Sequence, residues 1–444
     1  MTSLSLCAIR GPGSLMALVL GLALAPLAAS AQTPQDSLRT ELARLAARVD
    51  SLTREVARLT AAGQTEEAQD PLAQLRAAAQ AAAGDPQPTT RDEQATVGGA
   101  RSLQALNPEI SVTGDVFAHV NKDDVRQDNF FAREFEISLV SNLDPFSRAK
   151  VFVSRHFSGG EFEPFAGAED EHSDEGFTIE EGYVEWIGLV GGLSLKLGKF
   201  QQQFGQMNRW HSHALPFQTR SLSHLAFVGE EALSQAGASV HWLLPIGGGA
   251  GTYEATVEVT RSENETLFGD SGRPSVLGHL NAFWALSPST DLDLGLSWIN
   301  GSYEDPTTLI DRNLLGAEVA FTWRPPARAR YRGVTFRGGM MVLDGLVPEA
   351  PAAGDDRALG FWGGVETRLS ESWLVGARAD RVESPVDPDQ TAWLVSPTLT
   401  WWQSEFVRLR LEYDLLGRSA VASNEGRFVL QATFAMGPHR HESY

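Results

Sequence analysis

Extended segments in which apolar and polar residues alternate dominate the chain from about residue 107 to residue 436. Successive side chains of a β-strand leave opposite faces, so this alternation predicts strands with one apolar and one polar face. The clearest example is residues 406–415, with Val407, Leu409, Leu411, Tyr413 and Leu415 on one face and Arg408, Arg410, Glu412 and Asp414 on the other. A soluble sheet packed on a core would show the same local pattern. Its recurrence along the chain with almost no helical period favours an all-β transmembrane barrel, apolar outside and polar inside.

The alternation predicts about 16 antiparallel strands. Hydrocarbon offers no partner for an unpaired backbone N–H or C=O, so we expect the sheet to close on itself. A cylinder of this size is too wide for side chains to fill, which leaves a water channel. We expect the strands at residues 107–120, 132–143, 149–156, 177–187, 193–200, 236–244, 253–260, 276–286, 292–300, 315–324, 331–342, 358–369, 373–382, 392–402, 406–415 and 427–436.

Two further patterns support a membrane barrel. Short connections, such as residues 370–372 and 403–405, alternate with longer ones, such as 201–232 and 343–357, as they do when short periplasmic turns alternate with long outer loops. Tryptophan rings favour the boundary between lipid and water, so a ring of them marks one membrane interface. The tryptophans beside the short connections are Trp186, Trp242, Trp284, Trp323, Trp373, Trp401 and Trp402.

Three segments precede the predicted barrel, which we place at residues 107–444. Residues 1–31 have the basic, apolar and small-residue regions of a secretory signal peptide. Residues 37–60 carry an uninterrupted heptad seam, which predicts a periplasmic coiled coil between subunits, although one amphipathic helix lying on its own barrel would show the same seam. Residues 61–106 are rich in Ala, Gln, Pro and Gly and predict a flexible linker. The seam residues are Leu38, Leu42, Leu45, Val49, Leu52, Val56 and Leu59.

Bulk composition excludes several classes of protein. No run of 18 apolar residues follows the N-terminal segment, so helical membrane spans are not expected. The formal net charge of −20 argues against a nucleic-acid partner, because phosphates need a basic surface. Cys7 is the only cysteine and lies in the predicted signal peptide, so the mature chain has no thiolate metal site.

Charged residues on the inward face are the candidates for lining the pore. Opposite charges across a wet lumen would tune ion preference, whereas a merely solvated wall would select by size alone. The candidates are the cationic Lys150, Lys196, Arg337, Arg368, Arg378, Arg408 and Arg410 and the acidic Glu254, Glu258, Glu412 and Asp414, with Glu134, Glu136, Glu318, Glu366 and Asp380 also expected to face inward.

The long irregular stretch after Phe200 is the candidate for a constriction. If it folds inward, Arg209, His211, His213 and Arg220 narrow the pore. A His-x-His pair can ligate a metal, but the sequence supplies no third ligand nearby, so we predict no metal site and no cofactor. Gly-x-Ser-x-Gly is absent and no catalytic signature is convincing, so we do not expect an enzyme.

Three local motifs resemble those of bacterial outer-membrane porins. They are residues 106–112 (LNPEISV), residues 197–200 (LGKF) followed by Phe204-Gly205, and Gly437-Pro438-His439. The chain is most similar to the porins grouped with the phosphate-selective porins O and P, some of which carry a periplasmic coiled coil. The resemblance covers residues 107–441 and implies a homotrimeric channel in the outer-membrane lipid that passes small hydrophilic solutes or ions.

Alternative functions stay open at this point. Phosphate selectivity would need a constriction rich in lysine and arginine, and here the stretch offers mainly Arg209 and Arg220 among histidines. A dedicated metal-ion channel is a related alternative. The coiled coil and linker also motivate a different class of protein, an envelope tether that joins the outer membrane to the cell wall and uses the barrel as its anchor.

Overall fold

The computed structural model describes residues 108–122, 129–156, 164–165, 176–246, 251–346 and 357–437. The predicted signal peptide, coiled coil and linker lie outside these ranges, as do the first two residues of the first porin-like motif and the last two of the third. Within them, no helix is both long and apolar enough to cross a membrane.

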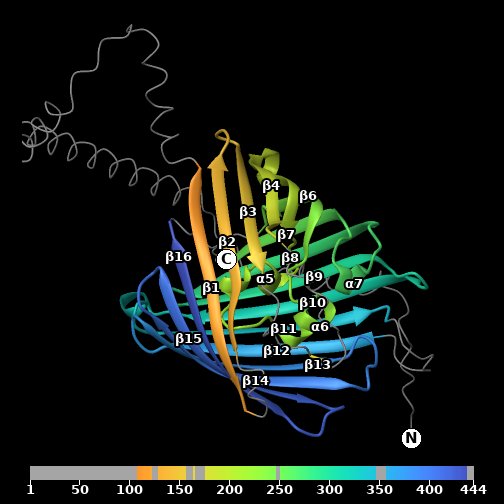
Figure 1. Cartoon of the computed structure of the whole chain (residues 1–444). Helices are drawn as coiled ribbons and strands as arrows, with labels where there is room; N and C mark the ends of the chain where they lie inside the picture. The colour runs from red at the N-terminus through yellow and green to blue at the C-terminus, as the bar shows by residue number, and fades with distance from the viewer. Residues whose placement is uncertain are drawn as a thin grey trace, which may run out of the picture. The chain divides into compact units, whose positions relative to one another are not determined.

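Sixteen antiparallel strands form one closed barrel, which confirms the predicted fold class (Figure 1). Each strand pairs with its neighbours in sequence, and β1 closes the sheet against β16 through a register that pairs Val112 with Met436 and Asn121 with Arg427. The strands are β1 (Glu109–Asn121), β2 (Asn129–Asn142), β3 (Ser147–His156), β4 (Thr178–Leu189), β5 (Leu193–Gln201), β6 (Ser234–Leu243), β7 (Gly251–Arg261), β8 (Pro274–Ser287), β9 (Thr290–Glu304), β10 (Leu309–Trp323), β11 (Gly333–Asp344), β12 (Arg357–Arg368), β13 (Trp373–Glu383), β14 (Thr391–Trp402), β15 (Val407–Arg418) and β16 (Glu425–Met436).

Short helical turns lie between some of these strands. The α-helices are α5 (Gly205–Asn208), α6 (Leu222–Phe227) and α7 (Glu265–Phe268), and the 3₁₀ turns are η3 (Val190–Gly192), η4 (Ser212–Ala214) and η5 (Pro326–Arg328). Of the α-helices, α5 and α6 both belong to the stretch between β5 and β6, and α7 follows β7.

The two faces of β15 have the character that the alternation predicts. On the outer face Leu411 is 45% exposed, whereas on the inner face Arg410 and Glu412 are 2% and 1% exposed. The neighbouring strand repeats the arrangement, with Leu430 exposed on the outside and Gln431 buried on the inside. An apolar outer surface and a polar inner one are what a barrel surrounded by hydrocarbon needs.

The two ends of the barrel differ in the lengths of their connections. The end with β2–β3 and β12–β13 has turns of residues 143–146 and 369–372, and the opposite end has the stretch 202–233 between β5 and β6. The connection 305–308 is short although it lies at the end with the long loops. Tryptophans gather at the short-turn end, where the rings of Trp373 and Trp401 stack with centroids 6.2 Å apart.

An apolar cluster inside the barrel departs from the prediction of a polar interior. It joins α6 and α7 to inward-facing residues of β8–β15 near the long-loop end, including Leu277, Ile299, Leu343 and Leu394. The sequence carries a sign of it, because apolar residues stand next to each other there, as in Leu394-Val395. A strand covered on both faces has this continuous apolar character instead of alternation.

Candidate functional site

The stretch between β5 and β6, residues 202–233, folds into the barrel. We call it the inner segment. Its helix α5 contacts β9 and β10, η4 contacts β1, and α6 lies against β11–β14. Figure 1 shows α5 and α6 surrounded by the strands. The inner segment therefore meets several parts of the wall and narrows the space that the barrel encloses.

Three buried arginines of the wall bind carbonyl oxygens of the inner segment. Arg378 donates to the Thr219 carbonyl at 2.6 Å and to its Oγ1 at 3.0 Å. Arg410 donates to the Leu215 carbonyl at 2.8 Å, and Arg408 donates to the same oxygen at 3.3 Å. A loop buried in a barrel must find partners for its peptide groups, and guanidinium groups supply several donors each.

Inward carboxylates of the wall accept hydrogen bonds from peptide N–H groups of the inner segment. Glu258 accepts from the Gln203 N–H at 3.2 Å, and Glu412 accepts from the Gln218 N–H at 3.0 Å. Glu318 accepts a hydrogen bond from the Gln206 N–H of α5 at 2.5 Å. Charged residues from β7, β10 and β15 therefore hold the inner segment at several points along its length.

The other candidates on the wall divide into buried residues and half-exposed ones. Lys150 and Asp414 are buried, the lysine 5.9 Å from the Tyr183 ring and the aspartate accepting a hydrogen bond from Ser396. Half-exposed inward positions, which are the ones that can contact water in the lumen, are Lys196, Glu254, Arg337 and Arg368. Arg337 also pairs with Glu366 at 3.0 Å.

The two arginines of the inner segment have different surroundings. Arg220 is buried and braces the segment from within, donating to the carbonyls of Met207, Trp210 and Glu230. Arg209 is half-buried and lies within electrostatic reach of the acidic groups that β9 and β10 carry. Arg209 is therefore better placed than Arg220 to act on a passing ion.

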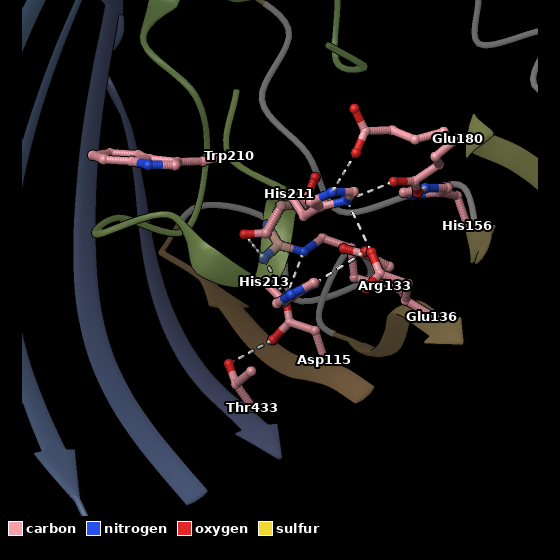
Figure 2. A network of polar contacts seen from close by, with 12 residues as sticks. Asp115, Arg133, Glu136, His156, Glu180, Trp210, His211, His213 and Thr433 are labelled. Atoms are coloured by element: carbon pink, nitrogen blue, oxygen red, sulfur yellow. Dashed lines mark hydrogen bonds and ion pairs between the residues drawn. The ribbon is translucent and has the colours of Figure 1, made fainter. Parts of the chain in front are cut away.

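His211 meets a group of carboxylates on the wall formed by β2–β4 (Figure 2). Its Nδ1 lies 2.8 Å from Glu136 Oε2 and 2.8 Å from Glu180 Oε2. Two residues further along, His213 Nδ1 lies 3.1 Å from Glu134 Oε1. One potential ligand atom from each member of a four-residue set lies within 4.8 Å of the others. We call this set, Glu134, Glu136, Glu180 and His211, the glutamate–histidine cluster.

The electrostatics of His211 reflect these neighbours. Burial lowers the pKa of His211, but the charge of Glu136 and hydrogen bonds with Glu136 and Glu180 together raise it well above its ordinary value. The imidazole ring also stacks on Phe152, with centroids 4.8 Å apart. His211 is therefore fixed by an aromatic face and by charge at once.

Two β-bulges help to build this part of the wall. The register of β1 against β2 shifts after Asp115, which leaves Arg133 as an extra residue beside Glu134. The register of β3 against β4 shifts after Phe152, which leaves Glu180 as an extra residue beside Glu181. A bulge re-aims side chains, so adjacent residues on each strand both reach the interior.

The sequence pattern predicts His211, His213 and the inward glutamates of β2 as candidates, but not Glu180 or its partner His156. Strict alternation assigns only one of Glu180 and Glu181 to the interior, and a bulge leaves no simple trace in composition. The adjacent acidic pair in an otherwise alternating strand is the one signal that was present. The carboxylates that lie beside His211 thus come from β2 and β4, outside the local His-x-His motif.

Comparisons with known proteins agree with the fold. No family model matches the chain. An uncharacterized protein of Aquifex aeolicus (strain VF5) is 27% identical over 312 residues, which are 60% of this chain and 63% of that protein. The chain thus spans less than two thirds of that relative's length.

Two solved structures share the barrel. OprB of Pseudomonas putida superposes with a TM-score of 0.51 and 13% identity, covering 77% of this chain and 97% of that one. An anion-selective porin from Comamonas acidovorans gives a TM-score of 0.51 and 10% identity, covering 74% of this chain and 99% of that one. At such identities the likeness concerns the fold.

Proposed function

We propose that this protein is an outer-membrane porin through which small hydrophilic solutes or ions diffuse passively. The observation that carries the proposal is the closed barrel of sixteen strands with exposed leucines outside and buried charges inside. Such a surface is stable in hydrocarbon, and a barrel of this width encloses more space than its own wall side chains fill. The barrel folds of OprB and the Comamonas porin support the same function.

The inner segment serves as the constriction in this proposal. It crosses the interior and is held by arginines and carboxylates from several strands, so it sets the narrowest section of the path. The half-exposed inward charges are of both signs, with Lys196 and Arg337 opposed by Glu254 and Glu366. We expect weak ion selectivity from such a mixed wall.

The finer resemblance to phosphate-selective porins receives less support from these contacts. Phosphate recognition needs cationic donors that are free to bind an oxyanion. Arg378, Arg408, Arg410 and Arg220 are already committed to carbonyl oxygens of the inner segment. We therefore propose a general diffusion channel over a phosphate channel.

For the residues before the barrel, the proposal rests on the sequence alone. Residues 1–31 would direct export, residues 37–60 would form a periplasmic coiled coil, and residues 61–106 would tether it to a barrel that assembles as a trimer in the outer membrane. Deleting residues 32–103 separates this role from the channel. If the protein is a tether to the cell wall, cells that carry the truncated protein should lose envelope cohesion, whereas the conductance of the channel should be unchanged.

Planar-bilayer recording of the purified, folded protein tests the proposal directly. We expect discrete conductance steps and a small reversal potential in asymmetric potassium chloride. Replacing residues 206–230 by a short glycine–serine link is expected to raise the single-channel conductance several-fold, because the constriction is gone. A folded protein that gives no steps in either form would refute the porin assignment.

A further inference from the structure

Two carboxylate side chains of the glutamate–histidine cluster are almost fully buried. Glu134 and Glu136 are each 1% exposed. In the part of the chain that the structure describes, Glu134 Oε2 and Glu136 Oε1 accept no hydrogen bond. A buried carboxylate oxygen without a donor is costly, so buried charges are normally paired or bound to a metal ion. The two oxygens point to a missing cationic partner.

The remaining ligand atoms are already oriented by neighbours. His156 Nε2 holds the other oxygen of Glu180, and His213 Nδ1 lies 3.1 Å from the other oxygen of Glu134. On the far side of His211, Nε2 lies 3.7 Å from Glu181 Oε2. Metal ligands are typically fixed in this way, with the second nitrogen of a histidine facing a carboxylate.

The spacing of the ligand atoms also fits an ion between them. His211 Nδ1 is 2.8 Å from one oxygen of Glu136 and from one oxygen of Glu180. Ligands placed about 2.0–2.2 Å from a metal ion, at the angles of ordinary coordination, lie roughly 3 Å apart. The two nitrogen–oxygen distances are therefore only slightly shorter than those between two ligands of one ion.

We propose that the glutamate–histidine cluster binds one divalent transition-metal ion. The mixed set of one imidazole nitrogen and several carboxylate oxygens suits ions such as Zn²⁺ and Mn²⁺ better than Ca²⁺ or Mg²⁺, which prefer oxygen alone. Two ligands come from β2, one from β4 and one from the inner segment. The ion therefore cross-links the inner segment to the barrel wall.

This inference is independent of the porin function. A metal ion that joins β2, β4 and the inner segment would have the same ligands in a barrel of any activity. Its measurement needs only folded protein and the ion, so failure to conduct and failure to bind metal are distinguishable results.

Equilibrium dialysis of the purified, EDTA-treated and folded chain against Zn²⁺ or Mn²⁺ tests the proposal, with bound metal counted by elemental analysis. We expect a saturable site with one ion per chain that excess Ca²⁺ does not displace. Glu136→Gln and, separately, His211→Gln should weaken that site at least tenfold. In electron paramagnetic resonance, the wild type should also reduce the sharp six-line signal of free Mn²⁺ more than the variants do at the same total Mn²⁺.

Glu254→Gln is the matched control, because Glu254 is an inward carboxylate on β7 outside the cluster. It should leave the affinity unchanged. Heat-modifiable migration on a gel verifies that each variant is folded, and Glu180→Gln replaces any variant that is not. Absence of a saturable site in the wild type, or equal binding by the folded cluster variants and the wild type, would overturn the proposal. Protonated histidines would then compensate the negative charge of the carboxylates.

Discussion

Arginine side chains inside this barrel act as peptide-binding groups as much as charges. Arg378 is the clearest case, because it pairs with Asp380 at 2.9 Å and at the same time binds two oxygens of Thr219. Both side chains of the pair are fully buried. Removing one member leaves the other charge without compensation, which costs more than the pair itself contributes.

Arg378→Ala is therefore expected to lower the free energy of unfolding by roughly 3–5 kcal/mol. The inner segment should also become a better trypsin substrate at Arg209 and Arg220. Urea titration of the protein in lipid vesicles, followed by tryptophan fluorescence, measures the first effect. Arg357→Ala is the control, because its ion pair with Asp344 is exposed and should contribute under about 1 kcal/mol. Equal losses in the two variants would contradict the account of Arg378.

His224 on α6 gives a prediction about pH. Burial, reinforced by the charge of Arg220, lowers the pKa of His224 well below its ordinary value of 6.5. Below pH 6.5, His224 therefore takes up a proton in the unfolded chain but stays neutral in the folded chain. The contribution of His224 to stability is constant above pH 6.5 and falls as the pH drops below it, toward the folded-state pKa.

We expect His224→Leu to remove this part of the pH dependence. Between pH 7 and pH 5 the stability of the wild type should fall relative to the variant by at most about 1.4 kcal/mol per pH unit. Unfolding titrations of both proteins at a series of pH values measure the difference. His211 titrates in both proteins alike and cancels. Parallel curves would mean that His224 is not held neutral.

At the scale of elements, the sequence predicts the wall far better than the inner segment. The strand β15 is predicted by a local pattern, because apolar residues recur at every second position and charged residues stand between them. The contact between Arg408 and Leu215 joins residues 193 positions apart, and no local pattern encodes it. The same holds for Glu180, because its inward direction depends on a bulge.

The position of α6 depends on a glycine of the wall beneath it. Gly360 lies on the inner face of β12, and a Cβ there would overlap the side chain of Ser223 and lie 3.1 Å from Val382 Cγ2. Gly360→Val should therefore push α6 off the wall. Hydrogen exchange of the amides of residues 222–227 should accelerate at least tenfold, and the single-channel conductance should change.

The control for this substitution is Gly278→Val on β8, where an added Cβ meets nothing within 4 Å. That variant should keep the exchange rates and the conductance of the wild type. Slow exchange in the Gly360 variant would show that α6 can be accommodated elsewhere. The pair of substitutions thus separates the loss of a glycine in a strand from a collision with the inner segment.

At the scale of the whole molecule, the environment of the outer surface decides the function. The exposed Leu411 lies near the middle of β15, and the exposed Val421 lies in the connection that follows it. In a bilayer the first would face hydrocarbon and the second would face water or headgroups. In a soluble barrel both would face water alike.

Arginine at these two positions should therefore have unequal costs. Leu411→Arg should lower the free energy of unfolding in lipid vesicles by about 2–4 kcal/mol, and Val421→Arg by about 0–1 kcal/mol, because a guanidinium is penalised most at the bilayer midplane. Both sites are exposed, so neither change creates a cavity or breaks an inner contact. Equal costs would place the apolar surface outside a membrane, and the water-filled path, the inner segment's role as a constriction and the porin function would have to be abandoned together.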